Sequence, residues 1–124
     1  MPSVPHAQPL LAVDIPLLLS SLNGRAALAR TVAHAFLRDL PQNLGAVHDS
    51  LASDDLTTAL LVAHRVRGNL EILRATGAAR TAAALEEAAR QGDVATAKRL
   101  VSVLREQLGH VEADLSTFLA TESG

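Results

Sequence analysis

Apolar residues recur at alternating intervals of three and four along this chain, and that pattern constrains its fold most strongly. It extends over residues 33–51, 56–73 and 94–118. Such spacing places one apolar stripe along a single side of an α-helix. Hydrophobic residues make up 48% of the chain but aromatic residues only 2%. A core of Leu, Ala and Val suits closely packed helices better than a sheet, which favours aromatic and β-branched residues.

Capping and turn residues divide the first half of the chain. Residues 1–11 carry three of the five prolines and no apolar period, which predicts a flexible tail or linker before a domain over residues 12–121. Asp14 is placed to cap a short helix that Asn23-Gly24 closes. The next helix carries its stripe in phase through Pro41, which favours one bent helix; two helices broken at Leu40 are the alternative.

Further turn signals delimit the second half of the chain. Ser53-Asp54-Asp55 predicts a helix start, and Thr76-Gly77 predicts a turn before an Ala-rich helix over residues 78–90, anchored by Leu85. Gln91-Gly92-Asp93 predicts a stop and a restart, and the last helix is expected to end near Ala120. Short turns make neighbouring helices antiparallel. We therefore expect an all-α fold, an up-and-down antiparallel four-helix bundle with a short extra N-terminal helix.

Composition argues against several classes of function. The formal net charge is -2, and no basic run is interleaved with aromatic residues, so nucleic acid is not an expected partner. The chain lacks cysteine, which removes thiol catalysis and thiolate metal sites and fits a reducing compartment. No apolar run approaches the roughly 20 residues of a membrane span, and no export signal is evident. We expect a cytoplasmic protein without membrane contact.

One histidine is placed for chemistry. At about 100° per residue, His64 falls roughly 130° from the centre of the stripe on its helix, so its side chain should reach solvent. Arg67 and Gly68 follow one turn later on the same side. A solvent-accessible imidazole beside a cation and a residue without a side chain suggests phosphoryl chemistry, although a lone histidine there is ordinarily a surface residue. The other histidines are interpreted as tail, surface or boundary residues that form no metal site: His6, His34, His48 and His110.

The residues around His64 resemble a known family motif. Ala63-His64-Arg65-Val66-Arg67-Gly68 is similar to the signature of histidine-containing phosphotransfer (HPt) domains, in which the phosphorylated histidine follows an alanine and precedes a variable residue, an aliphatic residue, a lysine and a glycine. Residues 36–41 resemble the family's second helix with its proline. Residues 85–93 resemble the segment that follows the histidine helix. The resemblance covers nearly the whole chain. HPt domains of this kind include the C-terminal domain of hybrid sensor histidine kinases.

The resemblance implies a role for each residue of the motif. His64 is expected to be phosphorylated, Arg67 to stabilise the phosphoryl oxygens, and Gly68 to permit close approach of a response-regulator receiver domain. The receiver is expected to supply Mg²⁺ and the acidic pocket, and this domain to bind no cofactor, metal or ATP. Four neighbours are candidates for the docking surface, with core packing as the alternative for the three apolar ones: Leu60, Leu61, Glu71 and Ile72.

The sequence departs from the family pattern at three positions. Arg67 replaces the usual lysine, Asn69 replaces a small residue, and Arg74 stands where many members have a glycine, so that Gly77 is expected to take over the turn. Glu71 is a possible partner for the second ring nitrogen of His64. Two further acidic residues are interpreted as a solvated face: Glu86 and Glu87.

Two functional hypotheses follow from the sequence. The first is a phosphocarrier that relays a phosphoryl group between receiver aspartates through His64, without kinase activity of its own, either alone or within a hybrid sensor kinase. The second is a non-phosphorylated helical adaptor that binds receivers or other signalling proteins through the same face. We expect a monomer, because a bundle of four helices needs no second copy to complete it.

Overall fold

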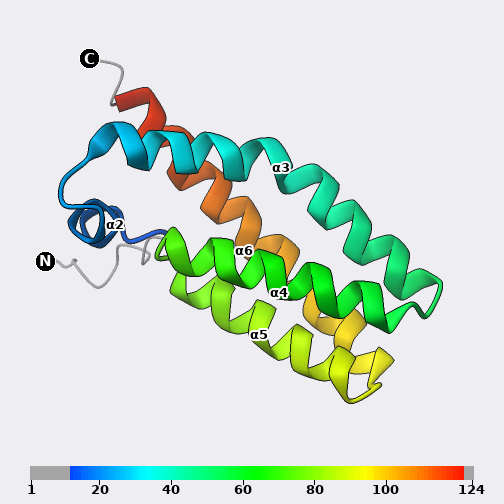
Figure 1. Cartoon of the computed structure of the whole chain (residues 1–124). Helices are drawn as coiled ribbons and strands as arrows, with labels where there is room; N and C mark the ends of the chain where they lie inside the picture. The colour runs from blue at the N-terminus through cyan, green and yellow to red at the C-terminus, as the bar shows by residue number, and fades with distance from the viewer. Residues whose placement is uncertain (1–11, 122–124) are drawn as a thin grey trace, which may run out of the picture.

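The computed structural model describes residues 12–121, and this part of the chain consists of helices without strands (Figure 1). The short helix α2 precedes four long antiparallel helices. Helix α3 packs against α4 and α6, and α5 packs against the same two helices, which closes a four-helix bundle. The expected fold class is confirmed. The predicted tail over residues 1–11 lies outside the described residues. The helices are α2 (Ile15–Ser21), α3 (Ala26–Ala52), α4 (Leu56–Ile72), α5 (Thr76–Arg90) and α6 (Val94–Thr121).

The predicted apolar stripes meet in the interior of the bundle. Helix α3 is continuous through Pro41, which lies on its exposed side, so the alternative of two helices broken at Leu40 is wrong. The buried side of α3 also takes in Phe36, whereas Leu37 and Leu44 of the predicted stripe are only partly buried. The largest fully buried side chains come from α2, α4, α5, α6 and the segments beside them: Val13, Leu18, Leu70, Leu73, Leu85, Leu108, Val111 and Leu115.

Aspartates cap the helices at the predicted positions. Asp14 accepts a hydrogen bond from the backbone N–H of Leu17 at 3.0 Å, and thereby caps α2. Asp55 accepts one from the N–H of Thr58 at 3.1 Å, at the start of α4. The hydroxyl and the N–H of Thr58 hold the pKa of the Asp55 carboxyl below its usual value. Each cap satisfies a donor that the first helical turn leaves without a partner.

The turn between α4 and α5 differs from the expectation. Helix α4 ends at Ile72, and Arg74 itself adopts the left-handed conformation with φ 62°. The N–H of Ala75 then donates to the carbonyl of Leu70 at 2.9 Å. Helix α5 begins at Thr76 and contains Gly77, so the prediction that Gly77 forms the turn is wrong. The backbone therefore places the left-handed residue of the turn at position 74, although an arginine rather than a glycine occupies it.

Replacing Arg74 with glycine should stabilise the fold. A left-handed backbone costs an L-residue roughly 1–2 kcal/mol, and glycine avoids most of this cost despite its larger loss of chain entropy. We expect Arg74→Gly to raise the free energy of unfolding in urea by about 1 kcal/mol. Arg80→Gly, in the exposed interior of α5, is the matched control and should lower it by about 1 kcal/mol. A loss of stability in both variants would contradict this account of the turn.

Candidate functional site

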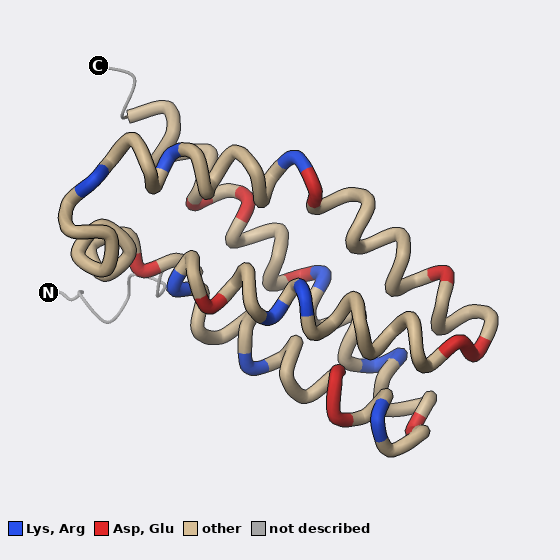
Figure 2. Tube along the Cα trace, viewed as in Figure 1, with Lys and Arg blue, Asp and Glu red and all other residues tan. Residues whose placement is uncertain are grey.

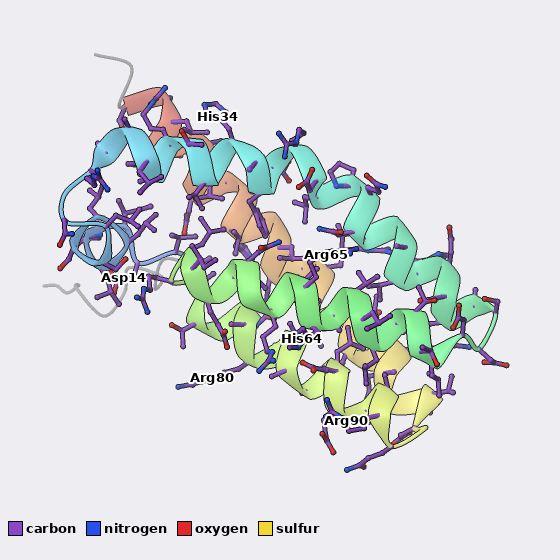
Figure 3. All side chains as sticks on the ribbon, in the orientation of Figure 1. Asp14, His34, His64, Arg65, Arg80 and Arg90 are labelled. Atoms are coloured by element: carbon purple, nitrogen blue, oxygen red, sulfur yellow. The ribbon has the colours of Figure 1, made fainter. Side chains whose placement is uncertain are left out.

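His64 lies on the side of α4 that borders α5. Its neighbours Ala63 and Val66 are buried in the core and fix the rotation of α4, while the side chain of His64 is 61% exposed. Figure 3 shows His64 between α4 and α5, with Arg65 on the side of α4 that faces α3. Consistent with this, Arg65 donates a hydrogen bond to Asn43 of α3 at 3.2 Å. The predicted position of the imidazole at the edge of the core is confirmed.

A glutamate of α5 contacts the ring of His64. Oε2 of Glu86 lies 3.0 Å from Nδ1, and the Glu86 side chain is 9% exposed. The expectation that Glu86 belongs to a solvated face is therefore wrong, although Glu87 does lie on that face. The expectation that Glu71 is the partner of the ring is also wrong, because Glu86 of the neighbouring helix contacts Nδ1.

Arg67 lies on the same side of the imidazole as Glu86. Its Nη2 is 2.9 Å from Nδ1 of His64, and its Nε is 3.1 Å from Oε1 of Glu86. The contact to Glu86 is an ion pair without hydrogen-bond geometry, because the buried Nε has no hydrogen-bond partner. The guanidinium thus faces Nδ1. No hydrogen bond from the described part of the chain involves Nε2, and the imidazole side chain is 61% exposed.

Arg90 completes a charged cluster around Glu86. Its Nη2 lies 3.1 Å from Oε2 of Glu86, and its Nη1 lies 2.5 Å from Oε1 of Glu87. Hydrogen bonds from Gln91 and Arg90, together with the charge of Arg90, lower the pKa of the Glu87 carboxyl. One nearly buried carboxylate therefore faces two guanidinium groups and one imidazole. Arg90 and Glu86 lie on consecutive turns of α5, so the helix itself fixes their spacing.

Comparison with models of known protein families identifies the family of this chain. The profile described as the Hpt domain matches residues 31–114, a range that runs from α3 into α6 and contains His64, Arg67, Gly68 and Glu86. The chain belongs to the Hpt domain family. Hpt domains act in phosphotransfer within two-component signalling and interact with response-regulator receiver domains. Neither the curated proteins nor the solved structures include one that matches this chain.

The Hpt domain presents most of the candidate docking residues to solvent. Leu61 is 59% exposed and Ile72 is 51% exposed, so neither is a core residue. Leu60 is partly buried against the core, and Glu71 is exposed. A Cβ built on Gly68 meets no atom within 4 Å, which leaves open space beside His64. The docking role of these residues remains a proposal.

Charged groups elsewhere on the Hpt domain are dispersed. Figure 2 shows basic and acidic residues interspersed along the helices rather than gathered by sign. The other described histidines, His34, His48 and His110, are exposed as expected. Within residues 12–121, no helix is long and apolar enough to cross a membrane. None of these features competes with the cluster around His64 as a site for chemistry.

Sequence reasoning missed Glu86, although the pattern of α5 contained a signal for it. Glu86 lies four residues after Ala82 and three before Ala89, both of which are buried. A carboxylate at a position in phase with a buried stripe is not a solvated residue unless the stripe ends there. It also requires a partner, because an isolated charge is costly to bury. The nearby cations on α4 and α5 supply that partner.

Proposed function

We propose that His64 accepts a phosphoryl group from an aspartyl phosphate of a receiver domain and passes it to a second receiver aspartate. The observation that carries this proposal is the difference in hydrogen bonding between the two ring nitrogens. Nδ1 of His64 is engaged by Glu86 and Arg67, whereas no hydrogen bond within the described residues involves Nε2 of this side chain, which is 61% exposed. An accessible ring nitrogen whose opposite nitrogen is fixed is the arrangement that a nucleophilic histidine needs.

In the proposed transfer, the lone pair of Nε2 attacks phosphorus as the bond between phosphorus and the aspartyl oxygen breaks. The aspartate leaves as a carboxylate, and a nitrogen–phosphorus bond forms on His64. The ring then carries positive charge if its Nδ1 retains a proton. The carboxylate of Glu86, 3.0 Å from Nδ1, stabilises that charge. The reverse reaction with a second receiver restores the neutral imidazole.

The receiver domain is proposed to supply the groups for phosphoryl transfer that this chain lacks. The receiver contributes Mg²⁺ and its acidic pocket, because phosphoryl transfer depends mostly on positioning and on neutralising the charge of the phosphoryl oxygens. Gly68 leaves space for that pocket, and Leu61 and Ile72 offer exposed apolar side chains next to it. We further propose that this domain is a monomer and works in the cytoplasm, as a separate protein or joined to a hybrid sensor kinase.

The test is transfer of labelled phosphate. Receivers of the source genome are phosphorylated on aspartate with a labelled small phosphodonor, freed of the donor, and mixed with this protein. We expect the label to move to this chain from at least one receiver, and to be lost in acid but retained in base, as a phosphoramidate is. If a receiver binds the chain and no label moves, the protein is instead an adaptor that works without phosphorylation.

A further inference from the structure

Nδ1 of His64 contacts two neighbours that require opposite protonation states of this nitrogen. Oε2 of Glu86, at 3.0 Å, is an acceptor and requires a proton on Nδ1. Nη2 of Arg67, at 2.9 Å, is a donor and requires a free lone pair on Nδ1. A neutral imidazole satisfies only one of them, because its single proton is on either Nδ1 or Nε2. The contact with Glu86 thus favours one tautomer and the contact with Arg67 favours the other.

The two tautomers differ in reactivity toward phosphorus. With the proton on Nδ1, the lone pair of Nε2 faces solvent and can attack. With the proton on Nε2, the exposed nitrogen has no lone pair to offer, and the free nitrogen is turned toward Arg67. The neighbours of Nδ1 therefore decide whether the accessible nitrogen is a nucleophile.

The two neighbours also differ in how firmly they are fixed. The side chain of Glu86 is 9% exposed, and it is paired with Arg90 as well as with Arg67. The side chain of Arg67 is 31% exposed and reaches its partners over a long, flexible stem. Arg67 can turn its Nη2 away from the ring and still retain its ion pair with Glu86 through Nε, at 3.1 Å from Oε1. Glu86 is therefore the fixed neighbour and Arg67 the movable one.

We propose that Arg67 and Glu86 compete for Nδ1 of His64, so that Arg67 favours the unreactive tautomer in the free domain and Glu86 the reactive one. This inference rests on the proposed phosphotransfer through Nε2. An incoming phosphoryl group draws the guanidinium of Arg67 toward its oxygens. The ring proton then resides on Nδ1, where it donates to Glu86, and the Nε2 lone pair becomes available. The proton stays on the ring during transfer, and the leaving aspartate takes the electron pair of the broken bond. Glu86 is thus a positioning residue.

The test is the tautomer ratio of His64 in the free protein. Long-range proton–nitrogen NMR spectra of the labelled protein report which ring nitrogen carries the proton, at a pH where titration in the same spectra shows the ring to be neutral. We expect Arg67→Met to raise the ratio of the Nδ1–H to the Nε2–H form by about fivefold or more, since a charged donor is lost. We expect Glu86→Ala to lower this ratio by a similar factor, and Glu86→Gln to lower it less.

Glu87→Gln is the matched control, because it removes a carboxylate of the same helix that does not contact His64. It should leave the ratio unchanged. Backbone amide signals in the same samples show whether each variant is folded, and Glu86→Gln replaces Glu86→Ala if the latter unfolds. An unchanged ratio in folded Arg67→Met and Glu86 variants would overturn the proposal. No receiver takes part in this experiment, so its outcome is independent of whether phosphate transfer itself occurs.

Discussion

His64→Gln should abolish acceptance of phosphate from any phosphorylated receiver. A glutamine amide has no nucleophilic nitrogen, so no nitrogen–phosphorus bond can form, and we expect the transfer rate to fall by at least about a thousandfold. The fold should be unaffected, because the histidine side chain is 61% exposed and its helix is anchored by Ala63 and Val66. The measurement is the rate at which label appears on the variant, with its thermal midpoint measured alongside.

The matched control for this variant is a histidine elsewhere on the surface. His34→Gln on α3 and His110→Gln on α6 change exposed imidazoles that lie on other helices. Both should accept label at the wild-type rate. Wild-type labelling of His64→Gln, or loss of labelling in His110→Gln, would mean that another residue is the phosphate carrier.

Gly68→Gln should reduce transfer by about tenfold or more without harming the fold. The bundle has open space at Gly68, since a Cβ there meets nothing within 4 Å, so a long side chain is accommodated in the free domain. Glycine costs a helix about 1 kcal/mol relative to alanine, and glutamine is nearly as favourable as alanine, so the free energy of unfolding should rise by about that amount. The same side chain would occupy the space through which a receiver reaches His64.

Gly45→Gln gives the matched control for this effect. Gly45 lies in α3, is exposed, and also has nothing within 4 Å of a built Cβ. We expect it to give the same gain in stability from urea unfolding while the transfer rate stays at the wild-type value. Equal transfer rates in the Gly68 and Gly45 variants would show that receivers do not approach His64 over Gly68.

Most of the fold could be predicted from the sequence because its signals are local. Each apolar stripe is fixed by the period of its own helix, and Asp14, Asp55 and Asp93 cap helices through contacts only three residues away. The α4–α5 turn was misplaced because residue preference pointed to Gly77, whereas the backbone places its left-handed residue at Arg74. Packing of Leu73 and Ala75 into the core fixes the turn there and overrides the preference.

The candidate site could be predicted only in part. His64, Arg67 and Gly68 lie within five residues of one helix, so their common side follows from helical geometry. Glu86 comes from α5, 22 residues away, and its contact with Nδ1 depends on how two helices pack. No pattern within α4 contains that information, so the sequence points instead to Glu71, the carboxylate on the histidine's own helix. The contact of Arg67 with Nδ1 could not be predicted for the same reason, because Arg67 contacts Glu86 of α5 at the same time.

The nitrogen that carries the phosphate tests the central claim most directly. The protein, labelled with nitrogen-15 in its histidines, is phosphorylated by a receiver, and NMR couplings between phosphorus and nitrogen identify the bonded atom. Because Glu86 and Arg67 contact Nδ1, and no hydrogen bond within the described residues involves Nε2, we expect a single phosphate on Nε2 of His64. Phosphate on Nδ1 of His64, or on any other residue, would contradict this account.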